Sequence, residues 1–162
     1  MHLKKIMKEL AAGIVIVFIF SNIINYIRQP EPASLSLPET TVTLIDKSSY
    51  RLHTGKPVVI HFWAVWCRIC KVEASNIERL SQTHEVLTIA VNSGEDTDIK
   101  AYMKEHDLHF KVLNDKEGKW ASQFHVEMFP TTFIYDAKGK LRFTEAGYTT
   151  TAGLLARMKV VE

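Results

Sequence analysis

The chain has 162 residues, enough for one domain and a short additional segment but too few for two full domains. Its 20 basic and 18 acidic side chains give a formal charge of +2, and that excess lies entirely before Ser34. Because the remaining sequence is neutral overall, nucleic acid is not expected as a partner.

An uncharged segment rich in Ile, Val and Phe covers residues 10–27 and is long enough to cross a bilayer. Three lysines precede it and Arg28 follows it, so the positive-inside rule places residues 1–9 in the cytoplasm and the later residues outside. No small-x-small cleavage site follows the apolar run directly, which favours an uncleaved transmembrane anchor. A cleaved signal peptide and a buried helix are the alternatives.

Residues 28–40 contain three prolines and little apolar sequence, which is typical of an extended tether. We therefore expect a single-pass protein of the inner membrane, with a folded domain at residues 41–162 on the periplasmic side. Both cysteines of the chain lie in that domain, which is compatible with an oxidising compartment.

The domain begins with two short predicted strands at 41–45 and 50–52, which are expected to form a hairpin. A buried strand at 58–62, a helix from about Ile69 to Thr83 and a second buried strand at 86–91 predict a right-handed unit with parallel strands. The remaining expected elements are a helix at 97–106, a strand at 110–113, a helix at 119–124, strands at 131–135 and 140–144, and a helix capped by Thr150 that ends near Met158.

Cys67 and Cys70 lie where the strand pattern changes to helical spacing. Cys67 is expected in the first turn of the helix, where unpaired N–H groups, the helix dipole and the neighbouring Arg68 all favour a thiolate. Cys70, one turn further, could then attack a mixed disulfide formed at Cys67. A zinc site would need two more ligands, and a structural disulfide across so small a loop stabilises little, so the pair favours thiol–disulfide exchange without a cofactor.

The residues around the cysteines resemble the Trp-Cys-x-x-Cys-Lys site of the thioredoxin superfamily, in the run Phe62-Trp63-Ala64-Val65-Trp66-Cys67-Arg68-Ile69-Cys70-Lys71. Over about residues 41–158 the chain is similar to the membrane-anchored TlpA/ResA-like branch. Within it, the copper-tolerance proteins of the ScsD group are the most similar, through Ser93-Gly94-Glu95-Asp96, Val112-Leu113-Asn114-Asp115 and Gly147-Tyr148-Thr149. The resemblance implies an α/β thioredoxin-like fold, a mixed central sheet flanked by helices, preceded by one transmembrane helix.

The resemblance also implies an envelope-facing thiol–disulfide oxidoreductase that reduces client protein disulfides and is recharged by a membrane thiol donor of the DsbD kind. Copper tolerance and cytochrome c maturation are the processes in which such proteins act. Arg68 by itself stabilises the reduced dithiol and makes the pair more oxidising, so the direction of electron flow stays open. A Cu(I)-binding module that uses the two cysteines is the alternative function.

Four positions near the cysteines acquire expected roles from the resemblance. Pro130 matches the cis-proline that faces the disulfide, and a trans proline at a strand start is the alternative. Phe129 would contact the client or lie in the core, and Trp66 would contact the client. Glu73 matches a glutamate that follows the second cysteine by three residues, where a raised pKa would let it exchange a proton with a thiol. An ordinary glutamate of a first helical turn is the alternative.

Three further residues are expected to tune the cysteine pair. Arg68 and Ile69 separate the two cysteines, and Ile69 replaces the proline of many relatives. His61 stands where thioredoxin has a buried aspartate, and it is either a proton relay or a hydrogen-bonded core histidine. The other histidines show no metal-ligand spacing.

Overall fold

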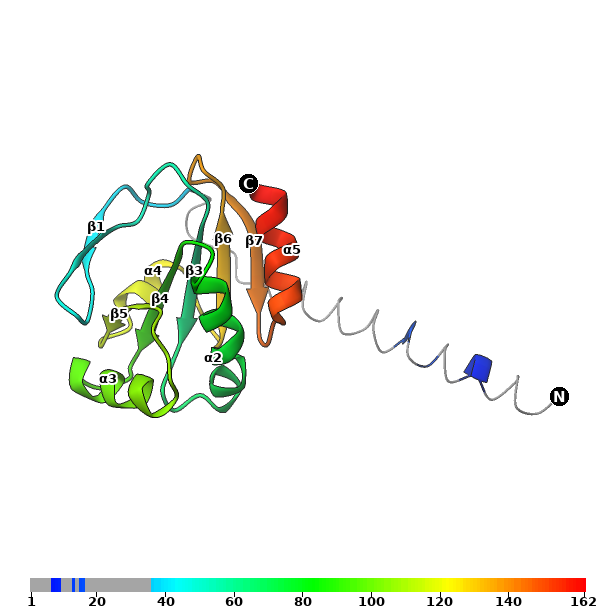
Figure 1. Ribbon diagram of the computed structural model, residues 1–162, viewed down its shortest axis with the longest axis horizontal. Coiled ribbons are helices and arrows are strands. Elements are labelled where there is room, and N and C mark those ends of the chain that lie inside the picture. The colour runs from blue at the N-terminus through cyan, green and yellow to red at the C-terminus, as the bar shows by residue number, and fades with distance from the viewer. Residues whose placement is uncertain (1–6, 10–12, 14, 17–35) are drawn as a thin grey trace.

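The computed structural model describes residues 7–9, 13, 15–16 and 36–162 (Figure 1). Within these residues no helix has both the length and the apolar character that a membrane span requires. The anchor expected at 10–27, apart from three positions, and the first part of the tether expected at 28–40 lie outside the described residues.

A five-stranded mixed sheet with the order β5-β4-β3-β6-β7 forms the centre of the domain (Figure 1). The central strand β3 (Val58–Trp63) pairs in parallel with β4 (Val86–Val91) and antiparallel with β6 (Thr131–Tyr135). On the outer sides, β5 (Lys111–Asp115) pairs in parallel with β4, and β7 (Leu141–Ala146) pairs antiparallel with β6. The three inner strands are buried along their whole length, which explains their nearly continuous apolar sequence.

Helices cover both faces of this sheet, as the fold expectation required. The helices α2 (Arg68–Ser81), α3 (Asp96–Glu105) and α5 (Thr151–Val161) pack on one face, and α4 (Lys119–Gln123) packs on the other. Right-handed connections from β3 to β4 and from β4 to β5 proceed in the same direction across the sheet, so α2 and α3 share a face.

A separate two-stranded sheet of β1 (Thr41–Thr43) and β2 (Ser49–Arg51) packs on the α4 side. This is the hairpin expected from the sequence. Leu37, within the range expected as tether, is buried in the same cluster, and its N–H donates to the carbonyl of Gly139. The folded unit therefore includes residues before position 41.

Side chains alternate between the two faces along β3, with the period of two that a strand imposes. Val59 and Trp63 pack among the side chains of α2, α3 and α5, whereas Val58, Ile60 and Phe62 pack toward α4. His61 shares the face of Val59 and Trp63, so the histidine lies beneath the helix that carries the cysteines.

Several expected boundaries were wrong by a few residues. The helix after the cysteines ends at Ser81, with Gln82 as its C-cap, and not at Thr83. The last strand continues to Ala146 because its pairing with β6 extends to the pair Thr131 and Ala146. The final helix continues past Met158 to Val161, since Val161 buries another side chain on the apolar face.

Candidate active site

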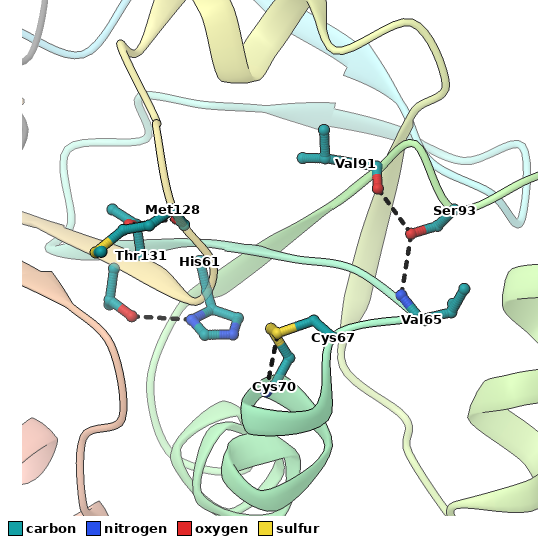
Figure 2. Close-up of a disulfide and its surroundings, with 9 residues drawn as sticks. His61, Val65, Cys67, Cys70, Val91, Ser93, Met128 and Thr131 are labelled. Carbon is teal, nitrogen blue, oxygen red and sulfur yellow. Dashed lines mark hydrogen bonds between the residues drawn. A yellow bond between two sulfur atoms is a disulfide. The ribbon is translucent and has the colours of Figure 1, made fainter.

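Cys67 and Cys70 form a disulfide at the N-terminus of α2, with their Cα atoms 5.2 Å apart (Figure 2). Cys67 is the N-cap residue, and its Sγ accepts a hydrogen bond from the Cys70 N–H at 3.1 Å. The N–H donor and the positive end of the helix dipole favour negative charge on this sulfur once the bond opens. The sequence predicted this placement.

The disulfide is nearly buried, and the two sulfurs differ in their shelter. Cys67 is 8% exposed and Cys70 2%, while the neighbouring Trp66 and Ile69 are 60% and 52% exposed. A partner can therefore approach over these apolar side chains and reaches Cys67 more readily than Cys70. Arg68 is also exposed beside the pair, and the roles of these three residues in tuning and client contact stay predictions.

The loop that leads to the disulfide is held by the segment after β4. The Val65 N–H donates to Ser93 Oγ at 3.1 Å, and Ser93 Oγ donates to the carbonyl of Val91 at 2.9 Å (Figure 2). The indole of Trp66 donates to the carbonyl of Asn92 at 3.1 Å. Ser93 was not expected as a site residue, although a small polar residue directly after a buried strand is the signal that could have indicated it.

Replacement of Ser93 by alanine is expected to destabilise the oxidised protein by about 1–3 kcal/mol, because it leaves the Val65 N–H without its partner. Urea unfolding of the oxidised chain measures the change. Ser122→Ala, at an exposed position in α4, is the matched control and should stay within about 0.5 kcal/mol of the parent. Equal midpoints for Ser93→Ala and the control would show that the hydroxyl does not hold this loop.

The peptide bond between Phe129 and Pro130 is cis, as the resemblance implied. Pro130 is buried, and Phe129, immediately before it, is half-buried. The Phe129 ring meets the Trp66 ring edge-on, with 5.7 Å between the ring centroids. Behind this turn, Thr131 Oγ1 donates to the carbonyl of Met128 at 2.9 Å (Figure 2). The structure thus joins the proline turn to the cysteine loop through an aromatic pair, and a role of these residues in client binding stays a prediction.

Glu73 is fully buried, which is more than the partial shelter that the sequence suggested. Its Oε1 accepts a hydrogen bond from the Thr149 N–H at 3.0 Å, and its Oε2 has no partner among the described residues. Burial raises the pKa of Glu73 to about 8, the negative charge of Glu145 acts in the same direction, and the Thr149 bond opposes them. A carboxyl group in this state differs from an ordinary ionised glutamate of a first turn.

His61 is buried, and its Nδ1 is 2.9 Å from the Oγ1 of Thr132 on the neighbouring strand. Burial lowers the pKa of His61 to about 3, so the ring is neutral at physiological pH. These observations support the alternative of a hydrogen-bonded core histidine over a proton relay. Across residues 36–162 and the few positions described before them, no cluster of three or more His, Cys, Asp or Glu could hold a metal ion.

The family model described as the AhpC/TSA family matches residues 29–144 of the chain. A thioredoxin-like protein from Haemophilus influenzae is 25% identical over 100% of this chain and 98% of its own length. The thiol–disulfide oxidoreductase ResA of Bacillus thuringiensis is 34% identical over 54% of this chain, and the match spans 53% of ResA, about half its length.

Solved structures share the fold. The exposed lipoprotein thioredoxin Etrx1 of Streptococcus pneumoniae superposes with a TM-score of 0.68 and 28% identity, over 76% of this chain and 99% of Etrx1. The mixed sheet flanked by helices is therefore a thioredoxin-like fold, with its cysteine pair at the N-terminus of a helix. The similarity to ResA supports a place in the ResA-like branch of thiol–disulfide oxidoreductases, and the chain belongs to the AhpC/TSA family.

Proposed function

We propose that this chain is a membrane-anchored, envelope-facing reductase of disulfides in client proteins. The observation that carries the proposal is the disulfide itself, with Cys67 as N-cap and Cys70 sheltered one turn further into α2. This arrangement gives the two sulfurs different tasks. The uncharged segment at residues 10–27 supports the anchor, and the family resemblance described above supports the reducing direction.

Exchange begins from the reduced chain, in which the Cys67 thiolate attacks one sulfur of a client disulfide. The client's other sulfur leaves as a thiolate, and a mixed disulfide joins Cys67 to the client. Cys70 then loses its proton and attacks the Cys67 sulfur, which releases the second client thiolate. Two electrons have passed to the client, and the Cys67–Cys70 disulfide has formed.

Glu73 is the group proposed to accept the proton from Cys70. It follows Cys70 by three residues on α2, so the two side chains are neighbours on one helix face, and both are buried. Its Oε2 has no hydrogen-bond partner among the residues that the oxidised structure describes. A pKa near 8 suits a group that must both accept and return a proton close to neutral pH.

The client is proposed to dock over Trp66, Phe129 and Pro130, where an exposed indole meets the cis-proline turn. Arg68 and Ile69 would tune the potential from the exposed side of the pair. A membrane thiol donor of the DsbD kind would return two electrons to the disulfide after each cycle. Copper tolerance and cytochrome c maturation are the proposed settings, on the resemblance described above.

The reduction potential of the full-length chain in detergent tests the proposal. The chain is equilibrated in thiol/disulfide buffers, and tryptophan fluorescence follows the disulfide because Trp66 adjoins Cys67. We expect one two-electron transition near the thioredoxin value of about −270 mV. A transition near about −120 mV would make the chain a disulfide donor and refute the reducing direction, and the lack of any transition would refute exchange.

A further inference from the structure

We propose that the ion pair between Glu145 and Arg157 controls the charge of the Glu73 carboxyl and thereby sets the pH range in which Cys70 exchanges its proton. The inference rests on the proposed function, because it deepens the role given there to Glu73. Glu145 and Arg157 are assigned as positioning residues that act through Glu73.

A row of polar side chains crosses the sheet beneath α2. His61 of β3 lies directly opposite Thr132 of β6, and Thr132 lies directly opposite Glu145 of β7. Residues opposite each other in antiparallel strands project from the same face of a sheet. Glu145 therefore shares with His61 the face that α2 and α5 cover, and it is 7% exposed.

Arg157 of α5 neutralises Glu145 at the outer end of this row. Its Nε lies 2.6 Å from Glu145 Oε1, and its Nη1 donates to the carbonyl of Gly153 at 2.9 Å. The second bond fixes the guanidinium to its own helix while 30% of the Arg157 side chain reaches solvent. The guanidinium is always charged, so the pair places a carboxylate inside and a cation at the surface.

Glu73 of α2 binds the segment that joins β7, which carries Glu145, to α5, which carries Arg157. The Thr149 N–H that binds Glu73 Oε1 follows the end of β7, and Asn76 of α2 also donates to the carbonyl of Thr149 at 3.0 Å. Two bonds from α2 thus fix the segment between β7 and α5 against Glu73. The charged or titratable groups on the elements packed here are His61 of β3, Tyr135 of β6, Arg142 and Glu145 of β7, Arg157 and Lys159 of α5, and Arg68, Cys70, Lys71, Glu78 and Arg79 of α2 itself.

Arg68, Lys71 and Arg79 of α2 are exposed, and Glu78 accepts the N–H groups of His109 and Phe110. Glu145 contributes to the raised pKa of Glu73, and Arg157 is its ion-pair partner. His61 is neutral because burial lowers its pKa, and Arg142 and Lys159 are exposed to solvent, which screens them. The negative charge of Glu145 favours the neutral form of Glu73, and the positive charge of Arg157 favours the ionised form. Burial is the main cause of the upward shift of the Glu73 pKa, and the carboxylate of Glu145 adds to it.

The two partners can be removed one at a time, and the expected shifts have opposite signs. Glu145→Gln keeps a side chain of the same shape but leaves the Arg157 cation alone, so the pKa of Glu73 should fall. Arg157→Gln leaves the Glu145 carboxylate alone, so the pKa of Glu73 should rise. Each shift should be on the order of one pH unit, the lower range for a nearby charge.

Carbon-13 NMR of the Glu73 side-chain carboxyl, assigned with Glu73→Gln, measures this pKa in the oxidised full-length chain. Glu85→Gln is the matched control, since Glu85 also forms an ion pair, but with Lys111 of β5. The pH profile of client reduction should move in the same direction as the Glu73 pKa in each variant.

Opposite shifts in the two variants, with no shift in the control, would support the inference. Shifts of the same sign would overturn it, because a pair that only packs β7 against α5 would admit water to Glu73 when either partner is lost. The pKa measurement needs no turnover, so it is independent of the proposed function. A parent chain with no reductase activity would refute that function whatever the pKa shows.

Discussion

Cys67→Ser is expected to lower the rate of client disulfide reduction by at least about 10³-fold, because Cys70 is then the only thiol left in the chain. Cys67 lies at the N-cap, where its Sγ accepts the Cys70 N–H, and it is the less sheltered of the two sulfurs. Cys70 is 2% exposed and cannot replace it as the attacking group. Reduction of a model disulfide by the chemically reduced chain measures the loss.

Cys70→Ser should produce a different defect. Cys67 can still attack a client, but no second thiol releases the mixed disulfide, so the adduct should accumulate to about one equivalent. Mass spectrometry of the chain after incubation with oxidised glutathione detects it. The same incubation of Cys67→Ser should give little adduct, which makes the two variants controls for each other.

The assignment of the two sulfurs would be contradicted if Cys67→Ser formed the adduct as readily as Cys70→Ser. The helix N-terminus would then not determine which sulfur attacks. Equal activity of both variants and the parent would contradict exchange through this pair altogether.

Local patterns predicted the centre of the site because the residues involved are close in sequence. The change from strand spacing to helical spacing at Cys67 is a property of about twenty consecutive residues, and it located both β3 and α2. Pro130 was recognised from the few residues around it. The ends of elements were less accurate, since pairing with β6 and burial of Val161 extend β7 and α5 beyond what the local pattern shows.

The groups that surround the cysteines could not be predicted in the same way. Glu145 and Thr132 meet only through the register of β7 on β6, and Arg157 joins them through an ion pair between β7 and the helix that follows it, which no local pattern marks. The sequence does contain one sign of this cluster. Glu145 follows Phe143 by two positions in a strand, so an acidic residue occupies an inward position, which requires a partner.

Glu73→Gln is expected to change the pH dependence of stability more than any other substitution of an acidic residue in the domain. The amide keeps an oxygen to accept the Thr149 N–H and is neutral at every pH, as the protonated carboxyl is. In the parent chain burial raises the folded-state pKa of Glu73 from 4.5 to about 8. The stability that belongs to the protonated form is therefore complete below about pH 4.5 and is lost as the pH rises through about 8.

The free energy of unfolding of the parent should fall relative to Glu73→Gln by on the order of 3–5 kcal/mol between pH 4.5 and 9, at about 1.4 kcal/mol per pH unit within that interval. Urea unfolding at closely spaced pH values measures the difference. The disulfide must stay oxidised throughout, because its cysteines then do not titrate and Glu73 is isolated. Glu105→Gln, at an exposed position in α3, should follow the parent curve. If the free energies of unfolding of the parent and of Glu73→Gln differ by a constant amount over this interval, Glu73 is already ionised near pH 4.5 in the folded chain. An ionised Glu73 with an ordinary pKa could neither hold the proton of Cys70 near neutral pH nor respond to the charge of Glu145.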